Sequence, residues 1–214
     1  MKKKISKVLI ITGILLVLSA ILLCIYNFHE SERAFEQSQE VLTELKNIIP
    51  EQMQDTSQNN SEISENPADD LFAPYEEEEE KAPEPVEVDG SFYCGYITLP
   101  TLGLELPVAN EWSYPVLKNS PCRFSGSAVE SDLIIAAHNY NSHFGRIGDL
   151  NSGDEIIFTD TQGKSYHYEV DHTQFVDGTD AEEMFSGQAE EWDITLFTCT
   201  LSGRSRVTVR GVKR

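Results

Sequence analysis

The segment Thr195-Leu196-Phe197-Thr198-Cys199 places a cysteine at the end of an apolar, β-favouring run close to the C-terminus. A turn-like stretch follows at once, Thr200-Leu201-Ser202-Gly203-Arg204, and then the basic run Ser205-Arg206-Val207-Thr208-Val209-Arg210. Runs of about 4–8 β-branched and aromatic residues bounded by turn residues are typical of β-strands. The two runs therefore predict neighbouring strands that bring a thiol and fixed positive charges close together.

The chain from residue 91 to residue 214 repeats this pattern of short β-rich runs separated by turn residues. The predicted strands are 93–99, 104–108, 132–137, 155–159, 165–170, 174–176, 194–200 and 206–211. Residues 160–163 suit a hairpin turn, and residues 112–118 and 181–185 suit short helices. Many short strands and few helices predict a mainly β domain that forms a closed or nearly closed β-barrel.

The N-terminal region predicts a membrane anchor in residues 1–28. Residues 8–26 carry no charge, and this run approaches the ~20 residues that span a bilayer as a helix. Lysines precede it and Glu30 and Glu32 follow, which predicts a cytoplasmic N-terminus and an extracellular remainder. A cleaved signal peptide is the alternative, but the run exceeds the usual apolar core of ~7–15 residues and no A-x-A-like site follows.

Two further segments separate this anchor from the β-rich domain. Residues 29–50 carry apolar side chains at near-helical intervals and end at Pro50, which predicts a juxtamembrane amphipathic helix. Residues 51–90 are rich in Asn, Ser, Gln, Glu and Pro, so they predict a disordered acidic linker that acts as an extended tether. The formal net charge of -20 argues against nucleic-acid binding.

Cys199 is the candidate nucleophile, although a cysteine in an apolar strand is by default a small buried hydrophobe. A nucleophilic cysteine needs a nearby cation and a proton carrier. His138 follows an apolar strand and would be delivered to a sheet rim, while His143 in the next loop is the second candidate. The two-residue period places Arg204, Arg206 and Arg210 on one face of their strand, a pattern that by default indicates a solvated face.

The same residues resemble a known family. Thr195-Leu196-Phe197-Thr198-Cys199 is similar to the TLxTC signature of sortases, and Arg206-Val207-Thr208-Val209-Arg210-Gly211 resembles the strand that carries their essential arginine. Ile135-Ala136-Ala137-His138-Asn139 resembles the histidine loop of that family, and residues 96–108 resemble its opening hairpin. The resemblance implies a sortase-like eight-stranded β-barrel with catalytic His138, Cys199 and Arg206, supported by Thr198 and Asn139.

The resemblance also implies an activity. Sortases are cysteine transpeptidases of Gram-positive cell surfaces, so Cys199 is expected to attack an LPxTG-type sorting motif of secreted proteins and form a thioacyl intermediate. A peptidoglycan precursor or another amine would accept the acyl group, His138 would act as general acid and base, and Arg206 would stabilise the oxyanion. No cofactor is expected. Calcium binding by acidic residues in 177–183 and a metal site of His138, His143 and Cys199 are the alternatives.

Several alternatives stay open on the sequence. A membrane-tethered cysteine hydrolase needs the same residues, and a noncatalytic extracellular binding module needs none of them. Cys94 and Cys122 either form a disulfide or remain two free thiols, because spacing alone does not show whether their Cβ atoms approach each other. The short connection from Cys199 to Arg206 differs from the longer insertion usual in class B sortases, and the subtype stays open.

Overall fold

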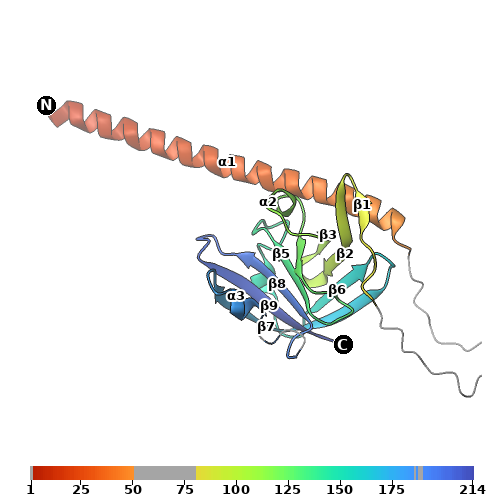
Figure 1. Cartoon of the computed structure of the whole chain (residues 1–214). Coiled ribbons are helices and arrows are strands. Elements are labelled where there is room, and N and C mark those ends of the chain that lie inside the picture. The colour runs from red at the N-terminus through yellow and green to blue at the C-terminus, as the bar shows by residue number, and fades with distance from the viewer. Residues whose placement is uncertain (1, 51–80, 186, 188–189) are drawn as a thin grey trace, which may run out of the picture.

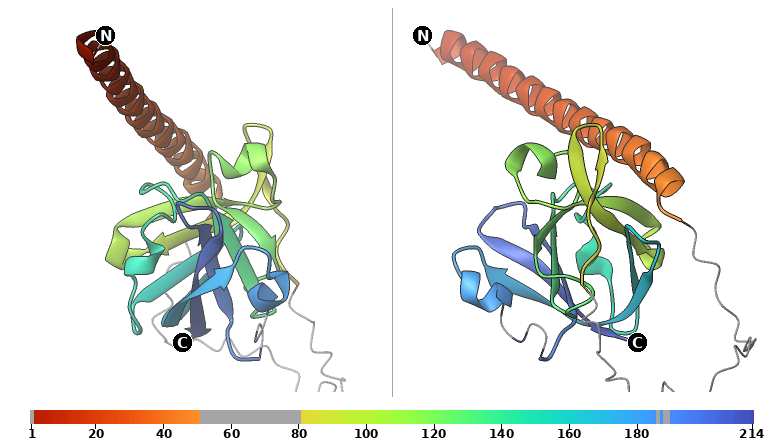
Figure 2. Two further views of the ribbon diagram at one scale, coloured as in Figure 1. Left: turned by 90° about the vertical axis from the view of Figure 1, so that its left-hand side faces the viewer. Right: turned by 45° about the vertical axis from the view of Figure 1, so that its right-hand side comes forward.

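The computed structural model describes residues 2–50, 81–185, 187 and 190–214 of the chain. A long helix, α1 (Lys2–Ile48), runs across one side of a β-rich domain (Figures 1 and 2). The strands of that domain are β1 (Val86–Val88), β2 (Ser91–Leu99), β3 (Leu104–Ala109), β4 (Cys122–Ser125), β5 (Leu133–Ala137), β6 (Glu155–Asp160), β7 (Ser165–Asp177), β8 (Ile194–Cys199) and β9 (Ser205–Lys213).

Eight of these strands close into a barrel. Their order is β2-β3-β4-β5-β8-β9-β7-β6, and an additional pairing between β2 and β6 joins the two ends of the sheet. β1 is a short extra strand that pairs only with β2. The pairs β3–β4 and β5–β8 are parallel, and the others are antiparallel. The mainly β, eight-stranded barrel expected from the sequence is confirmed.

The short helices also lie near their expected positions. α2 (Tyr114–Leu117) is shorter than the predicted segment 112–118, and the side chain of Ser113 accepts a hydrogen bond from the backbone N–H of Val116 at its N-terminus. α3 (Ala181–Phe185) has the predicted bounds. Two short 3-10 helices, η1 (Pro100–Leu102) and η2 (Ile147–Asp149), complete the described elements.

Three strand predictions need correction. The predicted strands 165–170 and 174–176 form one long strand, β7. The register of its pairing with β9 shifts between Val170 and His172, so the predicted gap between two strands is an irregularity within one strand. β4 was not predicted, because its residues lack a clear alternating pattern. β1 lies inside the segment 51–90 that was predicted to be disordered, and its backbone groups are paired with β2. The rest of that prediction, residues 51–80, falls outside the described residues.

The domain has two hydrophobic cores, one on each face of the sheet. The first fills the barrel and includes Ile97, Leu106, Ile135, Leu196 and Val209. The second lies on the outer face, where residues of α1 and α2 cover Tyr93, Ala109, Cys122 and Ala136. Alternate residues of β5 and β8 therefore contribute to different cores.

The cysteines are all free, and the sheet explains why Cys94 and Cys122 do not pair. Cys94 packs against the core inside the barrel, whereas Cys122 belongs to the core on the outer face. The two thiols therefore lie on opposite faces of the sheet. Burial raises the pKa of Cys94 to about 12 and that of Cys122 to about 11, so both stay protonated at neutral pH.

The predicted anchor and the predicted juxtamembrane helix form one uninterrupted helix, α1. Its first part carries exposed apolar side chains and is long and apolar enough to cross a membrane. Its last part packs on the barrel through a buried stripe, Ala34, Ser38, Leu42, Leu45 and Ile49. These positions recur every three or four residues, which keeps them on one face of the helix. The domain boundary drawn at residue 28 is thus not a break in structure.

Candidate active site

The strand register brings the three predicted catalytic residues together. β5 runs parallel to β8 with Ala137 opposite Thr198, so His138 and Cys199 both follow directly after this last pair. β9 runs antiparallel to β8 on its other side, with Arg206 opposite Cys199. Neighbouring strands lie about 4.8 Å apart. His138, Cys199 and Arg206 therefore form a row across three adjacent strands at one end of the barrel.

Cys199 lies on the outer face of the barrel wall. Leu196 of β8 and Val209 of β9 point into the barrel core, so the alternating residues Phe197, Cys199 and Arg206 face outward. Cys199 is exposed, in contrast to the buried cysteine that an apolar strand would give by default. The thiol is consequently accessible to a polypeptide substrate.

Thr198 supports the row from inside the wall. It is buried, and its hydroxyl donates a 2.8 Å hydrogen bond to the backbone carbonyl of Ala137. This bond joins β8 to β5 one residue before Cys199 and one residue before His138. Thr198 therefore positions the two strand ends relative to each other.

His138 is half-buried at the end of β5, with its ring 5.1 Å from the ring of Tyr140. Burial lowers the pKa of His138, and the positive charge of Lys118 lowers it further. Both effects disfavour the imidazolium form. The neutral imidazole is therefore favoured at neutral pH.

The loop after His138 is compact. Backbone N–H groups of Phe144 and Gly145 donate to the carbonyls of His138 and Tyr140 at 3.1 Å and 2.8 Å. A Cβ atom at Gly145 would lie only 2.5 Å from the carbonyl oxygen of Asn139, so this position requires glycine. Asn139 is half-buried at the start of the loop, and its supporting role stays a prediction.

His143, the second histidine candidate, is not part of the groove. It is fully buried beside the ring of Tyr140 and near the backbone of Ala34 in α1. Burial, assisted by the nearby His138, lowers its pKa to about 4. His143 is buried under α1 and does not line the groove that contains Cys199, so its role is in packing. Among the described residues, no group of three or more His, Cys, Asp or Glu side chains is placed to hold a metal ion, and the alternative metal site of His138, His143 and Cys199 stays a prediction.

Arg206 reaches back over the turn between β8 and β9. Its Nη1 donates to the backbone carbonyls of Gly203 at 3.1 Å and Ser205 at 3.3 Å. Hydrogen bonds from Thr179 hold the pKa of the Asp177 carboxyl below its usual range, and the charge of Arg206 contributes in the same direction. The guanidinium is thus held at the rim, beside the thiol and close to the end of β7.

An open groove leads to Cys199 and Arg206 across the outer face of the sheet. Most of its lining is apolar or aromatic: Trp112, Tyr114, Leu117, Phe124, Phe197, Met184 and Phe185. Phe124 lies at the centre of the aromatic contacts, with ring distances of 5.3 Å to Phe197, 5.9 Å to Phe185 and 6.4 Å to Trp112. The groove can therefore hold an extended, largely apolar peptide next to the thiol.

Arg210 lies beside the groove in a position that the sequence did not reveal. The alternation argument placed it on a solvated face, but it is fully buried. Its guanidinium donates to the carbonyls of Met184 at 3.0 Å and Glu183 at 2.6 Å, and to the hydroxyl of Thr195 at 2.7 Å. It thereby fastens the end of α3, which forms one wall of the groove, to the barrel. No local sequence pattern distinguishes Arg210 from an exposed strand arginine.

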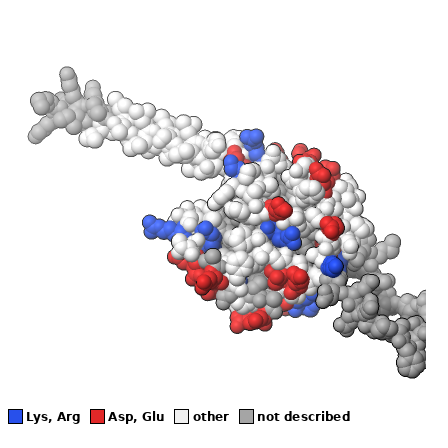
Figure 3. Space-filling view, viewed as in Figure 1, with Lys and Arg blue, Asp and Glu red and all other residues white. Residues whose placement is uncertain are grey.

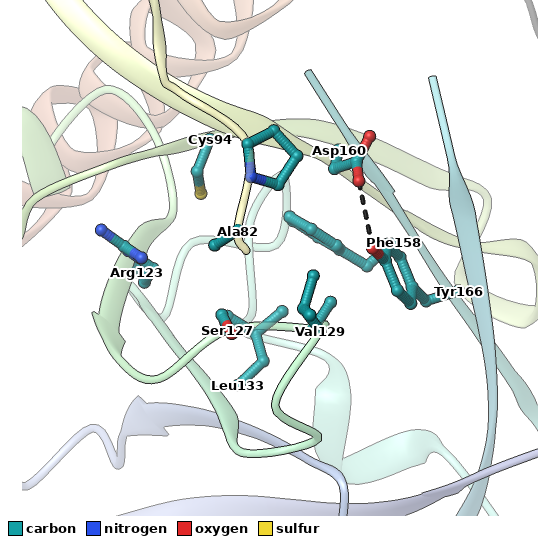
Figure 4. Close-up of a pocket in the computed structure, with 11 residues that line it drawn as sticks. Ala82, Cys94, Arg123, Ser127, Val129, Leu133, Phe158, Asp160 and Tyr166 are labelled. Atoms are coloured by element: carbon teal, nitrogen blue, oxygen red, sulfur yellow. Dashed lines mark hydrogen bonds between the residues drawn. The ribbon is translucent and has the colours of Figure 1, made fainter. Parts of the chain in front are cut away.

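A second, small cavity lies elsewhere in the domain, and Ala82 and Pro83 are among the residues that line it (Figure 4). Cys94 and Arg123 line one part of it, and Tyr166 donates a hydrogen bond of 3.1 Å to Asp160 on the other side. None of the residues predicted to act in catalysis lines this cavity. The candidate site is therefore the groove that ends at Cys199.

Comparisons with known proteins were made for the whole chain. The family model described as the sortase domain matches residues 97–214. No curated protein matches the sequence. Among solved structures, sortase A from Corynebacterium diphtheriae superimposes with a TM-score of 0.53 at 24% identity, covering 58% of this chain and 61% of that chain. This chain thus spans about three fifths of the length of that protein.

Two further solved structures show the same fold. Sortase C1 from Streptococcus agalactiae has a TM-score of 0.50 at 24% identity and covers 60% of this chain and 70% of that chain. The sortase D5 transpeptidase from Clostridium perfringens has a TM-score of 0.50 at 24% identity and covers 57% of this chain and 79% of that chain. This chain is thus similar in fold to sortases named A, C and D, and no single subtype stands out. Because the family model matches more than half of the chain, across the strands that carry His138, Cys199 and Arg206, this chain belongs to the sortase family.

Proposed function

We propose that this protein is a membrane-anchored cysteine transpeptidase that cleaves an LPxTG-type sorting motif and transfers the acyl group to an amine at the cell surface. The observation that carries the proposal is the row of His138, Cys199 and Arg206 at the end of an apolar groove. Membership of the sortase family supports the reaction class.

In the first half-reaction, the Cys199 thiolate attacks the backbone carbonyl carbon of the scissile bond. A C–S bond forms, the carbonyl π electrons move to oxygen, and the tetrahedral intermediate collapses as the C–N bond breaks. The leaving nitrogen takes a proton from the His138 imidazolium, which becomes neutral. The products of this step are a thioacyl-enzyme and the released C-terminal fragment with a free amine.

In the second half-reaction, an acceptor amine attacks the thioacyl carbon. Neutral His138 takes a proton from the attacking amine, a new C–N bond forms, and the C–S bond breaks to regenerate the thiolate. The acceptor is an amine of a peptidoglycan precursor or of another surface protein. The groove beside Cys199 excludes part of the solvent, which favours an amine over water as the nucleophile.

Arg206 stabilises the negative charge that develops on the substrate oxygen. Its strand position directly opposite Cys199 keeps the guanidinium near the reacting carbonyl, and its carbonyl contacts to Gly203 and Ser205 hold it in place before substrate binds. A charge that is fixed in advance needs little reorganisation in the transition state. Arg206 is therefore assigned the oxyanion role.

Residues 8–26 would hold the enzyme in the membrane as a single span. The apolar side chains of this part of α1 are exposed, as a lipid-facing helix requires. Lysines before the span and acidic residues after it favour a cytoplasmic N-terminus with the barrel outside. The substrates are then secreted proteins that carry a C-terminal sorting signal.

The proposal is tested with the full-length protein in lipid vesicles, an LPxTG-containing peptide and triglycine, with mass spectrometry of the products. We expect a ligated product whose share rises with triglycine concentration, a thioacyl-enzyme adduct on Cys199, and loss of both in Cys199→Ala. Cleavage without ligation at every triglycine concentration would identify a hydrolase instead. Absence of cleavage by the wild-type protein, with peptide binding that Cys199→Ala leaves unchanged, would favour a noncatalytic binding module.

A further inference from the structure

The contacts of α1 determine where the active site lies relative to the membrane. The sequence suggests that a long linker sets the reach of the catalytic domain, but the segment of α1 after residue 30 is docked on the barrel. Leu42, Leu45 and Ile49 are buried, the last two within the outer core. Because one unbroken helix contains both the apolar span and the docked segment, it fixes the distance and orientation of the domain relative to the membrane.

Polar contacts fix this docking along the helix axis. Ser31 and Ser142 share a hydrogen bond of 3.2 Å between their hydroxyl oxygens, at the start of the docked segment. Near its end, Lys46 forms an ion pair of 2.6 Å with Glu105, whose backbone carbonyl accepts a 3.0 Å hydrogen bond from Gln39. Contacts at both ends prevent the helix from sliding or rotating on the barrel.

The histidine loop is the part of the domain next to the end of the apolar span. Ser31 lies three residues after Phe28, which corresponds to about 4.5 Å along the helix. Ser142, its partner, belongs to the loop that begins at His138. Tyr140 of the same loop is close enough to Tyr26 and Glu30 for their charges to raise its pKa, in addition to burial. The catalytic histidine therefore begins a loop that lies within about one helical turn of the lipid boundary.

The turn between β8 and β9, residues 200–204, lies at the same end of the domain. In Figure 1 it points toward the side from which the N-terminal part of α1 arrives, and Figure 3 shows Lys and Arg side chains at that end with Asp and Glu side chains directly below them. Leu201 is 98% exposed, and Arg204 is also exposed. An apolar tip next to a basic side chain is costly in water but suits an interface with anionic lipids.

We propose that the docked helix holds the mouth of the active-site groove against the lipid surface, with Leu201 in contact with the bilayer, so that the enzyme acts on polypeptides held at the same membrane. The proposal rests on the membrane anchoring given under the proposed function. The partner is the lipid surface on the barrel's side of the membrane, and Arg204 at the turn favours anionic headgroups there.

The direct test uses tryptophan fluorescence in full-length protein reconstituted into vesicles of phosphatidylcholine and phosphatidylglycerol, with and without brominated acyl chains. Leu201→Trp is compared with Gln162→Trp, an exposed residue of the β6–β7 turn, which the strand directions place at the opposite end of the barrel. The chain has two natural tryptophans, Trp112 and Trp192, which are common to both variants.

We expect brominated lipid to quench the added tryptophan of Leu201→Trp strongly and that of Gln162→Trp by no more than the background. Equal quenching of the two variants, whether strong or absent, would overturn the proposal. Failure of the protein to float with the vesicles would instead refute the membrane anchoring itself. Because fluorescence does not depend on catalysis, a failure of the transpeptidase assignment would leave this result unchanged.

The consequence for substrates is tested with one peptide presented in two ways, free in solution and linked through a short spacer to a lipid in the vesicle. Leu45→Glu places a charge in the docked face, and Ile48→Glu is the matched control on the exposed face of the same helix turn. We expect Leu45→Glu to retain at least half of the rate on the free peptide and to lose at least fivefold on the lipid-linked peptide, while Ile48→Glu changes neither. An equal loss on both peptides, or on neither, would contradict the proposed role of docking.

Discussion

Cys199 and Arg206 lie directly opposite each other in the antiparallel ladder of β8 and β9. The connection between them is a short turn, so the proposed nucleophile and its proposed charge partner belong to one hairpin. The register of this hairpin, and not a flexible loop, determines their separation. The contribution of Arg206 to the proposed reaction should therefore depend on the length of its side chain and on the planar shape of its guanidinium group.

Replacing Arg206 should therefore impair the chemical step. With a soluble peptide substrate, we expect Arg206→Ala to lower kcat/KM by ~10²–10³-fold, because a donor fixed at the oxyanion is lost. Arg206→Lys should recover only part of this loss, since an ammonium lacks the fork of the guanidinium. Arg204→Ala, which removes an exposed charge two residues away, should stay within about threefold of the wild type. Similar losses for Arg204 and Arg206 would show that overall charge matters and not the ladder position.

The pH dependence should report His138. Peptide cleavage is expected to give a bell-shaped profile, because His138 must carry a proton while Cys199 has lost one. The lower of the two pKa values of such a pair sets the acid limb of the profile, and we expect this to be the pKa of His138. Lys118 lowers the pKa of His138 in addition to burial, so Lys118→Gln should raise that pKa and move the acid limb to higher pH. Lys164→Gln, in the β6–β7 turn, should leave the limb in place. Movement of the limb to lower pH in Lys118→Gln would contradict the assignment.

Thr198 should affect both stability and activity through its hydrogen bond to Ala137. Thr198→Val keeps the shape of the side chain but leaves the buried carbonyl without this donor, which is expected to lower the free energy of unfolding by ~1–2 kcal/mol. The rate should fall as well, because the ends of β5 and β8 carry His138 and Cys199. Thr198→Ser retains the hydroxyl and should restore most of both quantities. Chemical denaturation and peptide cleavage are the measurements, and a rate loss that serine does not restore would point to a different role.

Arg210 should control the groove wall. Arg210→Met leaves buried oxygens of Glu183, Met184 and Thr195 without their donor, which is expected to cost ~1–3 kcal/mol of unfolding free energy. Because α3 contributes Met184 and Phe185 to the groove, KM for the peptide should rise more than kcat falls. Arg210→Lys supplies charge without the three bonds and should give an intermediate KM. A pure loss of kcat with an unchanged KM would place Arg210 in the chemistry instead.

His143 should make the domain sensitive to acid. Its pKa of about 4 in the folded protein lies below the ordinary value of about 6.5, so the unfolded chain binds more protons between these two values. The unfolding free energy should therefore be unaffected above pH 6.5 and fall as the pH drops toward 4, by up to about 3 kcal/mol at full effect. Denaturation at pH 6.5 and 5 measures the slope. His143→Phe should flatten it, whereas His167→Gln, on the surface, should not; an unchanged slope in His143→Phe would refute the explanation.

Much of the fold could be read from local patterns. β8 is a short apolar, β-favouring run, and β9 alternates apolar and polar residues from Arg206 to Arg210. Turn residues such as Gly163 and Gly203 mark where the chain reverses, so the positions of these strands follow from neighbours in the sequence. Strands without such a pattern were missed. β1 and β4 exist because neighbouring strands supply partners for their backbone groups, and no residue within them signals that pairing.

The sequence by itself determined which residues are candidates for the row at the proposed active site, and the apolar character of the candidate membrane span. Cys199, His138 and Arg206 each end or begin a recognisable strand, and the anchor is a continuous uncharged run. Only the tertiary structure decided which faces are buried. It placed Arg210 under α3, His143 under α1 and the aromatic side chains along one groove, because burial depends on contacts between residues that are far apart in the chain. For the same reason, only the structure shows that the helix carrying the anchor docks on the barrel beside the loop of His138.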